Sequence, residues 1–185
     1  DAATARGIAV MNAPDGNTLA AAEHAVSLLF ALARHIPRAD AGMKAGEWPK
    51  NGLTGFELEG KRLGVIGLGR IGATVARKAV GIGMEVAAFD PFLPASAAGR
   101  MSVPMKPLDE LLAWADIITL HIPRTKETTN IIGEAQMRAM RKGSYLINAA
   151  RGGLVDEDAL LKVLDEGHLA GAALDTFVTE PLQKD

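Results

Sequence analysis

The sequence predicts an α/β fold built on a doubly wound, mostly parallel sheet. A short apolar run, suited to a strand buried on both faces, leads directly into a glycine-rich turn at Gly67–Gly72. A second apolar run ends at an acid, Asp90. Along the rest of the chain, strand-like and helix-like segments alternate, which is the order that produces a parallel sheet with right-handed crossovers. Ligands of such sheets bind at the carboxyl ends of the strands.

The glycine-rich turn is the most informative stretch of the chain. Leu63–Ile66 forms the strand before it, and the turn itself has the sequence GLGRIG. In this motif Gly67 permits a tight turn, Gly69 lets the backbone approach a pyrophosphate, and Gly72 lets the following helix pack closely on the sheet. The strand, turn and helix together predict a Rossmann-type dinucleotide-binding domain.

The helix after the turn supplies an attraction for phosphate groups. It is expected over Ile71–Ile82, where apolar residues recur at helical spacing. The unpaired N–H groups at its N-terminus, at Arg70 and Ile71, carry a partial positive charge. These two residues are therefore predicted contacts of the pyrophosphate.

Asp90 indicates which dinucleotide is bound. It stands eighteen residues after Gly72, where this fold places a carboxylate that accepts hydrogen bonds from ribose hydroxyls. A carboxylate repels a 2′-phosphate, and no lysine or arginine follows before Arg100, so we expect NAD rather than NADP. The alternative is that Asp90 and Pro91 only end the strand.

Composition and charge exclude several classes of function. The 185 residues include no cysteine, which excludes disulfides, cysteine-ligated metals and thiol catalysis, and the four histidines lack metal-site spacing, so no metal is expected. The 20 basic and 22 acidic residues are mixed along the chain, so neither nucleic acid nor a membrane is an expected partner. No apolar run has transmembrane length and no signal peptide is present, so we expect a cytoplasmic protein.

The region before the glycine motif is dominated by one apolar helix. Residues 1–17 begin abruptly, as if they were the tail of something upstream. A helix is predicted over Thr18–Ile36, with Thr18 as its N-cap. Because this helix is apolar almost all round, it is deeply buried, part of an oligomer interface, or both. Its histidines, His24 and His35, are interpreted as structural.

The remaining elements follow from periodicity and turn residues. Residues 48–60 are expected to be an irregular connection. Strands are predicted over Ile8–Met11, near Ser102 and Val103, and over Asp116–Ile122, Ser144–Ala149 and Leu169–Leu174; helices are predicted over Arg38–Ala45, Leu108–Ala115, Glu134–Arg141 and from a cap at Asp156 to Gly167.

Polar side chains at the later strand ends are candidates for chemistry. Arg151 follows a buried strand and precedes two glycines, which can aim a two-pronged donor at a small carboxylate or simply close a surface turn. Asp175 can hydrogen-bond an amide of the cofactor or only end its strand. Glu180, considered by itself, is interpreted as a solvated acid in a loop. One candidate site is therefore formed by Gly67–Gly72, Asp90, His121–Pro123, Asn148–Gly153 and Asp175–Glu180.

Three long stretches resemble the D-isomer-specific 2-hydroxyacid dehydrogenases. They are GLGRIG at Gly67–Gly72, NAARGGLVDEDALL at Asn148–Leu161 and GHLAGAALDTFVTEP at Gly167–Pro181. The likeness covers nearly the whole chain, and AAEHAVSLLFALARHIPRAD at Ala21–Asp40 points to members that act on D-3-phosphoglycerate. The resemblance implies hydride transfer between NAD and a D-2-hydroxy acid, most closely D-3-phosphoglycerate in serine biosynthesis.

The resemblance also assigns roles to residues. Arg151 would hold the substrate carboxylate, and Glu180 would hydrogen-bond the catalytic histidine and raise its pKa. Ile122 stands where relatives often carry threonine. Family members usually dimerise through the helix that matches Thr18–Ile36, so a homodimer is expected. The implied cofactor contacts are Gly67, Gly69, Arg70, Ile71, Gly72, Asp90, Ile122, Pro123, Ala149, Ala150, Arg151 and Asp175.

The catalytic histidine of the family lies in a Pro-His-x-Gly segment beyond the position of Glu180, and this chain does not contain that segment. We therefore expect residues 1–17 to be the tail end of a missing substrate lobe and residues 18–185 to be an NAD-binding domain truncated at its C-terminal end. Such a chain alone should bind NAD with negligible turnover. Two alternatives stay open, an NAD-sensing binding module of the corepressor type and a dehydrogenase for lactate, glyoxylate or hydroxypyruvate.

Overall fold

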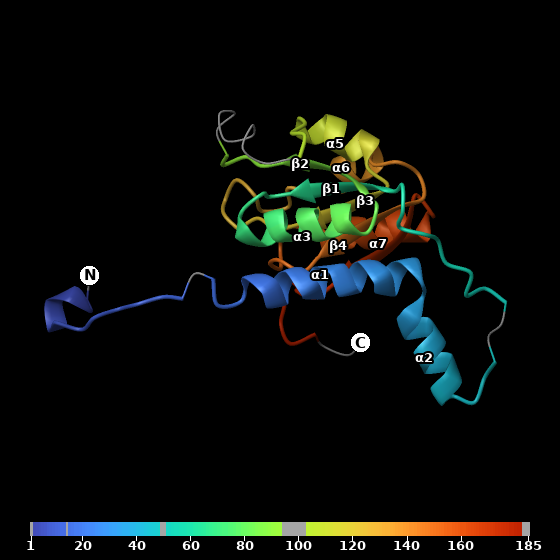
Figure 1. The fold of residues 1–185 in the computed structure, drawn as a ribbon, viewed down its shortest axis with the longest axis horizontal. Helices are drawn as coiled ribbons and strands as arrows, with labels where there is room; N and C mark the ends of the chain where they lie inside the picture. The colour runs from blue at the N-terminus through green and yellow to red at the C-terminus, as the bar shows by residue number, and fades with distance from the viewer. Residues whose placement is uncertain (1, 14, 49–50, 94–102, 183–185) are drawn as a thin grey trace.

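The structure, a computed structural model, describes residues 2–13, 15–48, 51–93 and 103–182. Its centre is a parallel five-stranded sheet with the strand order β2-β1-β3-β4-β5 (Figure 1). The order reverses next to β1, because the chain crosses from β2 over β1 to reach β3, and this confirms the predicted doubly wound α/β fold. The strands are β1 (Arg62–Ile66), β2 (Glu85–Phe89), β3 (Ile117–Leu120), β4 (Ser144–Asn148) and β5 (Leu169–Leu174).

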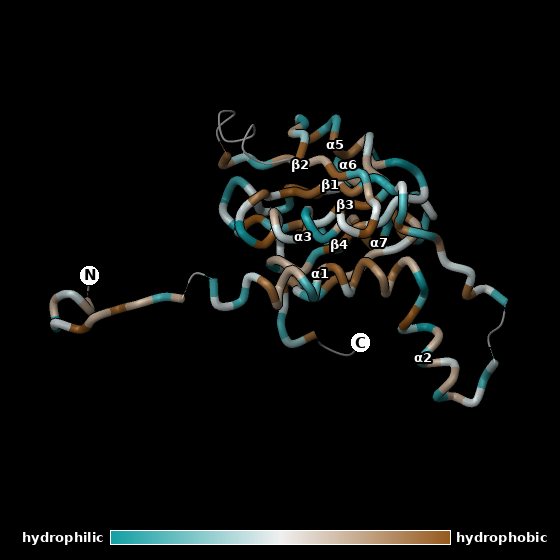
Figure 2. Tube along the Cα trace, in the orientation of Figure 1, coloured by the Kyte–Doolittle hydropathy of each residue, from teal (hydrophilic) through white to brown (hydrophobic). Residues whose placement is uncertain are grey.

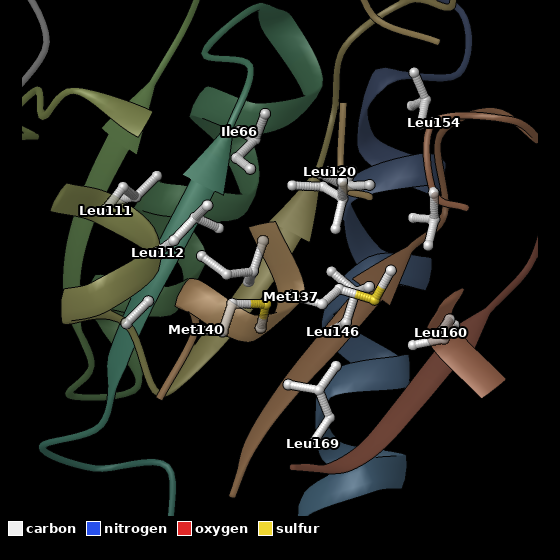
Figure 3. Packing of buried hydrophobic residues seen from close by; sticks show 14 of the residues in the cluster. Ile66, Leu111, Leu112, Leu120, Met137, Met140, Leu146, Leu154, Leu160 and Leu169 are labelled. Carbon is white, nitrogen blue, oxygen red and sulfur yellow. The ribbon is translucent and has the colours of Figure 1, made fainter. Parts of the chain in front are cut away.

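Helices cover both faces of the sheet and enclose two apolar cores. One core lies under α1 (Thr18–Ala33) and α3 (Arg70–Gly81), and the other lies under α5 (Leu108–Trp114), α6 (Glu134–Ala139) and α7 (Glu157–Asp165). Figure 2 shows that the most hydrophobic segments of the chain are the strands between these two layers of helices. In the second core, fully buried leucine and methionine side chains interdigitate (Figure 3), and each such leucine stabilises the fold by about 2 kcal/mol.

The helix predicted over Thr18–Ile36 is shorter than expected. α1 ends at Ala33, and α2 (Ile36–Lys44) begins after His35, whose backbone is left-handed with φ 51°. Within the described residues no single helix is long and apolar enough to cross a membrane, and the pair α1 and α2, which together reach that length, is bent by 68°. The predicted cap at Thr18 is also displaced by one position, because the N-cap is Asn17.

Two predicted strands differ from the structure. Ile8–Met11 forms no strand: it lies in an N-terminal arm that projects from the body, beyond reach of the described strands for pairing, and a short 3-10 helix, Thr4–Arg6, precedes it (Figure 1). The strand expected near Ser102 and Val103 is reduced to one parallel bridge between Met105 and Ala88, beside β2; Ser102 itself lies outside the described residues.

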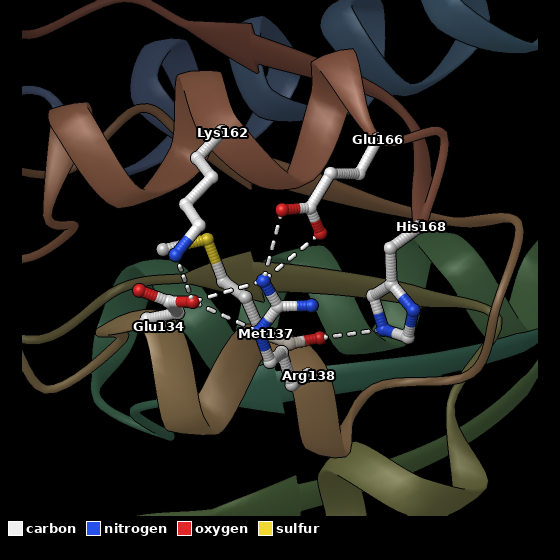
Figure 4. A network of polar contacts seen from close by, with 6 residues as sticks. All are labelled: Glu134, Met137, Arg138, Lys162, Glu166 and His168. Atoms are coloured by element: carbon white, nitrogen blue, oxygen red, sulfur yellow. Dashed lines mark hydrogen bonds and ion pairs between the residues drawn. The ribbon is translucent and has the colours of Figure 1, made fainter.

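A polar network joins α6 to α7 on the surface opposite α1. Arg138 contacts Glu134 and Glu166 at 2.9 Å each, and Lys162 contacts Glu134 at 2.8 Å (Figure 4). His168 Nε2 lies 3.0 Å from the carbonyl oxygen of Met137 and 3.1 Å from that of Met140 at the end of α6. Lys162 and Arg138 lower the pKa of the Glu134 carboxyl. Because these ion pairs are exposed, they fix the two helices to each other but contribute little stability.

Candidate functional site

The turn at Gly67–Gly72, called the glycine turn below, is closed against the sheet and the helix that follows it. Gly67 has φ 95°, and its N–H donates to the carbonyl oxygen of Phe89 at 2.7 Å. A Cβ atom on Gly72 would overlap the carbonyl oxygen of Gly67. The turn can therefore pass this closely over the start of α3 only with glycine at position 72, as the motif predicts.

Gly69 occupies a different environment from the other two motif glycines. It is the N-cap of α3 and has an ordinary φ of −65°, and a Cβ built on it would meet no atom within 4 Å. No side chain caps the helix. The first N–H groups of α3 therefore face open space beside Gly69, which is the arrangement that accepts a phosphate group.

Asp90 lies directly beside the glycine turn. Its Oδ2 accepts a hydrogen bond from the N–H of Leu68 at 2.7 Å, and its Oδ1 accepts from the N–H of Phe92 at 2.8 Å. The carboxylate thus ends β2, as the alternative interpretation states, and it lies at the edge of the glycine turn. Its hydrogen bonds to ribose hydroxyls stay a prediction. Arg100 lies outside the described residues.

A cavity of about 430 Å³ opens at the carboxyl ends of the strands, next to the start of α3. It brings together seven of the thirteen residues to which the family resemblance assigns a role. Gly67, Gly69, Arg70, Gly72, Asp90 and Glu180 are not part of its wall. The cavity is lined by Asn17, Ala21, His24, Ile71, His121, Ile122, Pro123, Ala149, Ala150, Arg151, Asp175 and Thr176.

The arginine side of the cavity is shaped by Asn148, which is buried at the end of β4. Its Nδ2 donates to the carbonyl oxygen of Arg151 at 3.0 Å, and its Oδ1 accepts from the N–H of Ala150 at 3.1 Å. A Cβ on Gly152 would overlap the carbonyl oxygen of Phe177, so this turn also packs against the segment after β5. The exposed guanidinium of Arg151 is thereby held at the cavity wall by a rigid turn.

His121 lines the cavity and lies close to the glycine turn. Its Nε2 lies 3.0 Å from Thr119 Oγ1, and burial lowers the pKa of the imidazole to about 4. Because desolvation disfavours the charged form, the ring is neutral at physiological pH. Its position at the end of the strand predicted over Asp116–Ile122 suggests that it alone of the four histidines lies near the crevice, and this is wrong, because His24 also lines the cavity.

The contribution of α1 to the cavity is not predicted by the sequence motifs. Asn17, Ala21 and His24 line one wall, and His24 Nε2 lies 3.1 Å from Asp175 Oδ1. His24 was interpreted as a structural histidine of a packing helix, whereas its side chain is 48% exposed and faces the site. The spacing of these three residues along one helix face was the available signal.

Glu180 stands apart from the cavity wall. It is exposed, and its Oε1 accepts a hydrogen bond from the N–H of Phe177 at 2.9 Å. The segment that carries it is fixed to α7, because the N–H of Val178 donates to Glu157 Oε1 at 2.7 Å. The carboxylate of Glu180 is thus presented to solvent beyond the end of β5.

The sheet order, the open helix N-terminus and the cavity at the strand ends together define a dinucleotide-binding domain. Residues 26–185 match the D-isomer specific 2-hydroxyacid dehydrogenase, NAD binding domain. The chain therefore belongs to the D-isomer specific 2-hydroxyacid dehydrogenases, and it contains their NAD-binding domain.

Curated relatives and solved structures agree with this assignment. The chain is 49% identical over its whole length to the D-3-phosphoglycerate dehydrogenase of Archaeoglobus fulgidus, and 48% identical over 98% of its length to that of Bacillus subtilis. It spans 35% and 34% of those two proteins, about a third of each.

Two solved structures place the same fold in proteins of this class. The pyruvate reductase of Chlamydomonas reinhardtii has a TM-score of 0.88 and 39% identity, with 100% of this chain and 55% of that chain covered. The D-lactate dehydrogenase of Aquifex aeolicus, complexed with NAD and lactic acid, has a TM-score of 0.83 and 35% identity, with 97% and 54% covered.

Proposed function

We propose that this domain serves an enzyme that transfers hydride between NAD and a D-2-hydroxy acid, with D-3-phosphoglycerate as the substrate and serine biosynthesis as its context. One observation carries the proposal: Arg151 and Asp175 line a single cavity that opens beside the uncapped N-terminus of α3. The relatives with the D-3-phosphoglycerate dehydrogenase name support the choice of substrate.

The residues present fit a bound dinucleotide. The open space at Gly69 and the free N–H groups of α3 suit the pyrophosphate, and Asp90 suits the ribose hydroxyls. Ile71, Ile122 and Pro123 give the cavity an apolar wall against which a flat ring can pack. Bound NAD would supply the acceptor for the hydride from C2 of the hydroxy acid, and NADH would supply the donor in the reverse direction.

Polar groups of the chain then orient the cofactor and the substrate. Asp175 accepts a hydrogen bond from the amide of the nicotinamide. Arg151 binds the carboxylate of the hydroxy acid through two parallel N–H groups, which fixes C2 beside the ring. Glu180 has the task that the family resemblance gives it, to hydrogen-bond the acid–base histidine and keep it a useful acid.

The chain is also proposed to form a homodimer through the α1–α2 region. Large apolar side chains are exposed there although α1 already buries its inner face against the sheet: Leu19 is 59% exposed, Phe30 39%, Ile36 50% and Met43 53%. A second copy would remove these side chains from water.

Calorimetric titration of the purified chain with NADH and, in parallel, NADPH tests the cofactor assignment. We expect saturable binding of NADH and at least tenfold weaker binding of NADPH, because the Asp90 carboxylate repels a 2′-phosphate. A tenfold difference in affinity corresponds to about 1.4 kcal/mol of binding free energy. Asp90→Ala should lose the preference. Asp90→Asn keeps an oxygen for the N–H of Leu68 but removes the charge, so it should lose the preference without loosening the turn. Equal affinity for the two cofactors in the unmodified chain would overturn the assignment.

A further inference from the structure

An imidazole and a carboxylate from distant parts of the chain form a pair inside the cavity. His24 Nε2 lies 3.1 Å from Asp175 Oδ1, and both side chains are 48% exposed. His24 belongs to the second turn of α1, and Asp175 immediately follows β5. Both residues line the cavity that also contains Arg151.

The two residues are held by rigid elements, which fixes the geometry of the pair. α1 packs through Ala25 and Leu29, each 2% exposed, into the core that also contains residues of α3. Asp175 is fixed by its own backbone, whose N–H donates to the carbonyl oxygen of Asn148 at 2.9 Å. The backbone positions of the two residues are therefore set by the packing of α1 on the sheet rather than by a flexible loop.

The pair leaves one carboxylate oxygen available to a ligand. His24 Nε2 contacts Oδ1, whereas Oδ2 has no polar partner among the described residues. A half-exposed carboxylate that carries no second contact can rotate about χ2, because this terminal torsion is broad. The contact with His24 removes that freedom and keeps Oδ2 in one orientation.

We propose that His24 is a positioning residue for the nicotinamide, acting through Asp175. The imidazole holds Asp175 so that Oδ2 accepts the carboxamide N–H of the bound cofactor, and the ring is thereby held in one orientation in the cavity. This inference rests on the proposed function, because it needs the nicotinamide to bind in this cavity. It assigns no contact between His24 and the adenosine or pyrophosphate parts of the cofactor.

Two ligands separate positioning of the nicotinamide from a general effect on the domain. NADH contains the nicotinamide, whereas ADP-ribose contains the adenosine and the pyrophosphate without it. His24→Leu should weaken NADH binding by about 3- to 10-fold, because Oδ2 of Asp175 is no longer held toward the carboxamide, and leave ADP-ribose binding unchanged. His24→Gln should restore NADH binding, because its amide nitrogen reaches the position of Nε2.

A matched control lies one turn further along the same helix. Ser27 is exposed, does not line the cavity, and donates its hydroxyl only to the carbonyl oxygen of Glu23. Ser27→Ala should bind NADH and ADP-ribose as the unmodified chain does. Calorimetry gives both affinities, and the fluorescence of bound NADH reports directly on the surroundings of the nicotinamide.

The outcomes distinguish this inference from the proposed function. If the unmodified chain binds NADH but His24→Leu binds it equally well, or if His24→Leu weakens ADP-ribose by the same factor, the positioning role is wrong and the proposed function stands. If the unmodified chain binds neither ligand, both are wrong. Selective weakening of NADH with rescue by glutamine establishes the role.

Discussion

The glycine turn is made of contiguous residues, whereas the cavity beside it draws its wall from α1, α3 and the ends of β3, β4 and β5. In the turn, the features proposed to bind phosphate are backbone N–H groups and the absence of side chains, so six consecutive residues carry nearly all the information. In the cavity, side chains from distant segments must converge. The comparison shows that a ligand held by backbone leaves a motif in the sequence, while a ligand held by convergent side chains depends on the packing of whole elements.

The largest expected effects come from two glycines, one in each region, whose added Cβ would overlap a backbone carbonyl oxygen. Gly72→Ala and Gly152→Ala should each lower the free energy of unfolding by about 3 kcal/mol, because the new Cβ would overlap a carbonyl oxygen that has no room to move. Urea unfolding measures the change. Gly81→Ala is the control, since no atom lies within 4 Å of its Cβ. If Gly72→Ala were as stable as Gly81→Ala, the carbonyl oxygen of Gly67 would not lie as close to Gly72 as the structure places it.

His121 lies where the two regions meet. Its N–H donates to the carbonyl oxygen of Ile66 at 2.7 Å, and a Cβ on Gly67 would lie 2.7 Å from its backbone carbonyl. Burial lowers its pKa from 6.5 to about 4 in the folded protein. Below pH 6.5 the unfolded chain binds a proton that the folded chain does not, so this residue makes stability fall with pH down to about 4 and adds no further loss below that.

The titration of His121 can be isolated by substitution. Between pH 7 and pH 4 its contribution to the loss of unfolding free energy should approach about 3 kcal/mol, from 1.36 kcal/mol per pKa unit. His121→Gln should show a correspondingly smaller loss over this range, because the carboxylates contribute equally to both proteins. Urea unfolding at several pH values gives the difference. Parallel curves for the two proteins would mean that His121 is protonated normally in the folded state.

How much the sequence could predict follows the same division. The sheet, the glycine turn and the cap of α7 by Asp156, whose Oδ1 accepts from the N–H of Ala159 at 3.1 Å, depend on neighbours along the chain and were predicted. The pair of His24 and Asp175 could not be predicted, because no local sequence pattern indicates that α1 crosses the end of β5. Ile8–Met11 has strand propensity, but a strand also needs a neighbouring strand to pair with. The break between α1 and α2 depends on the left-handed backbone of a single residue, His35, which no sequence pattern indicates.

The middle glycine of the motif, Gly69, tests whether the turn binds phosphate through its backbone. Gly69→Ala should leave the free energy of unfolding unchanged, because its Cβ meets no atom within 4 Å and its φ is ordinary. The same Cβ would occupy the space above the N-terminus of α3, so the affinities for NADH and ADP-ribose should both fall by about tenfold or more. Calorimetry with each ligand is the measurement. Unchanged affinity would place the pyrophosphate elsewhere.

The smallest expected effect concerns an ion pair at the edge of the glycine turn. Arg70 Nε lies 3.0 Å from Asp15 Oδ1, with the side chains 63% and 78% exposed. Because exposed pairs are weak, Asp15→Asn should change the free energy of unfolding by less than about 0.5 kcal/mol. It should nevertheless raise the affinity for NADH by about 2- to 3-fold, since it removes a negative charge near the pyrophosphate and releases the guanidinium. The gain should shrink at high salt, where exposed charges are screened. A fall in affinity would show instead that Asp15 holds Arg70 in its binding position, and the edge of the turn would then depend, like the cavity, on a residue distant from the motif.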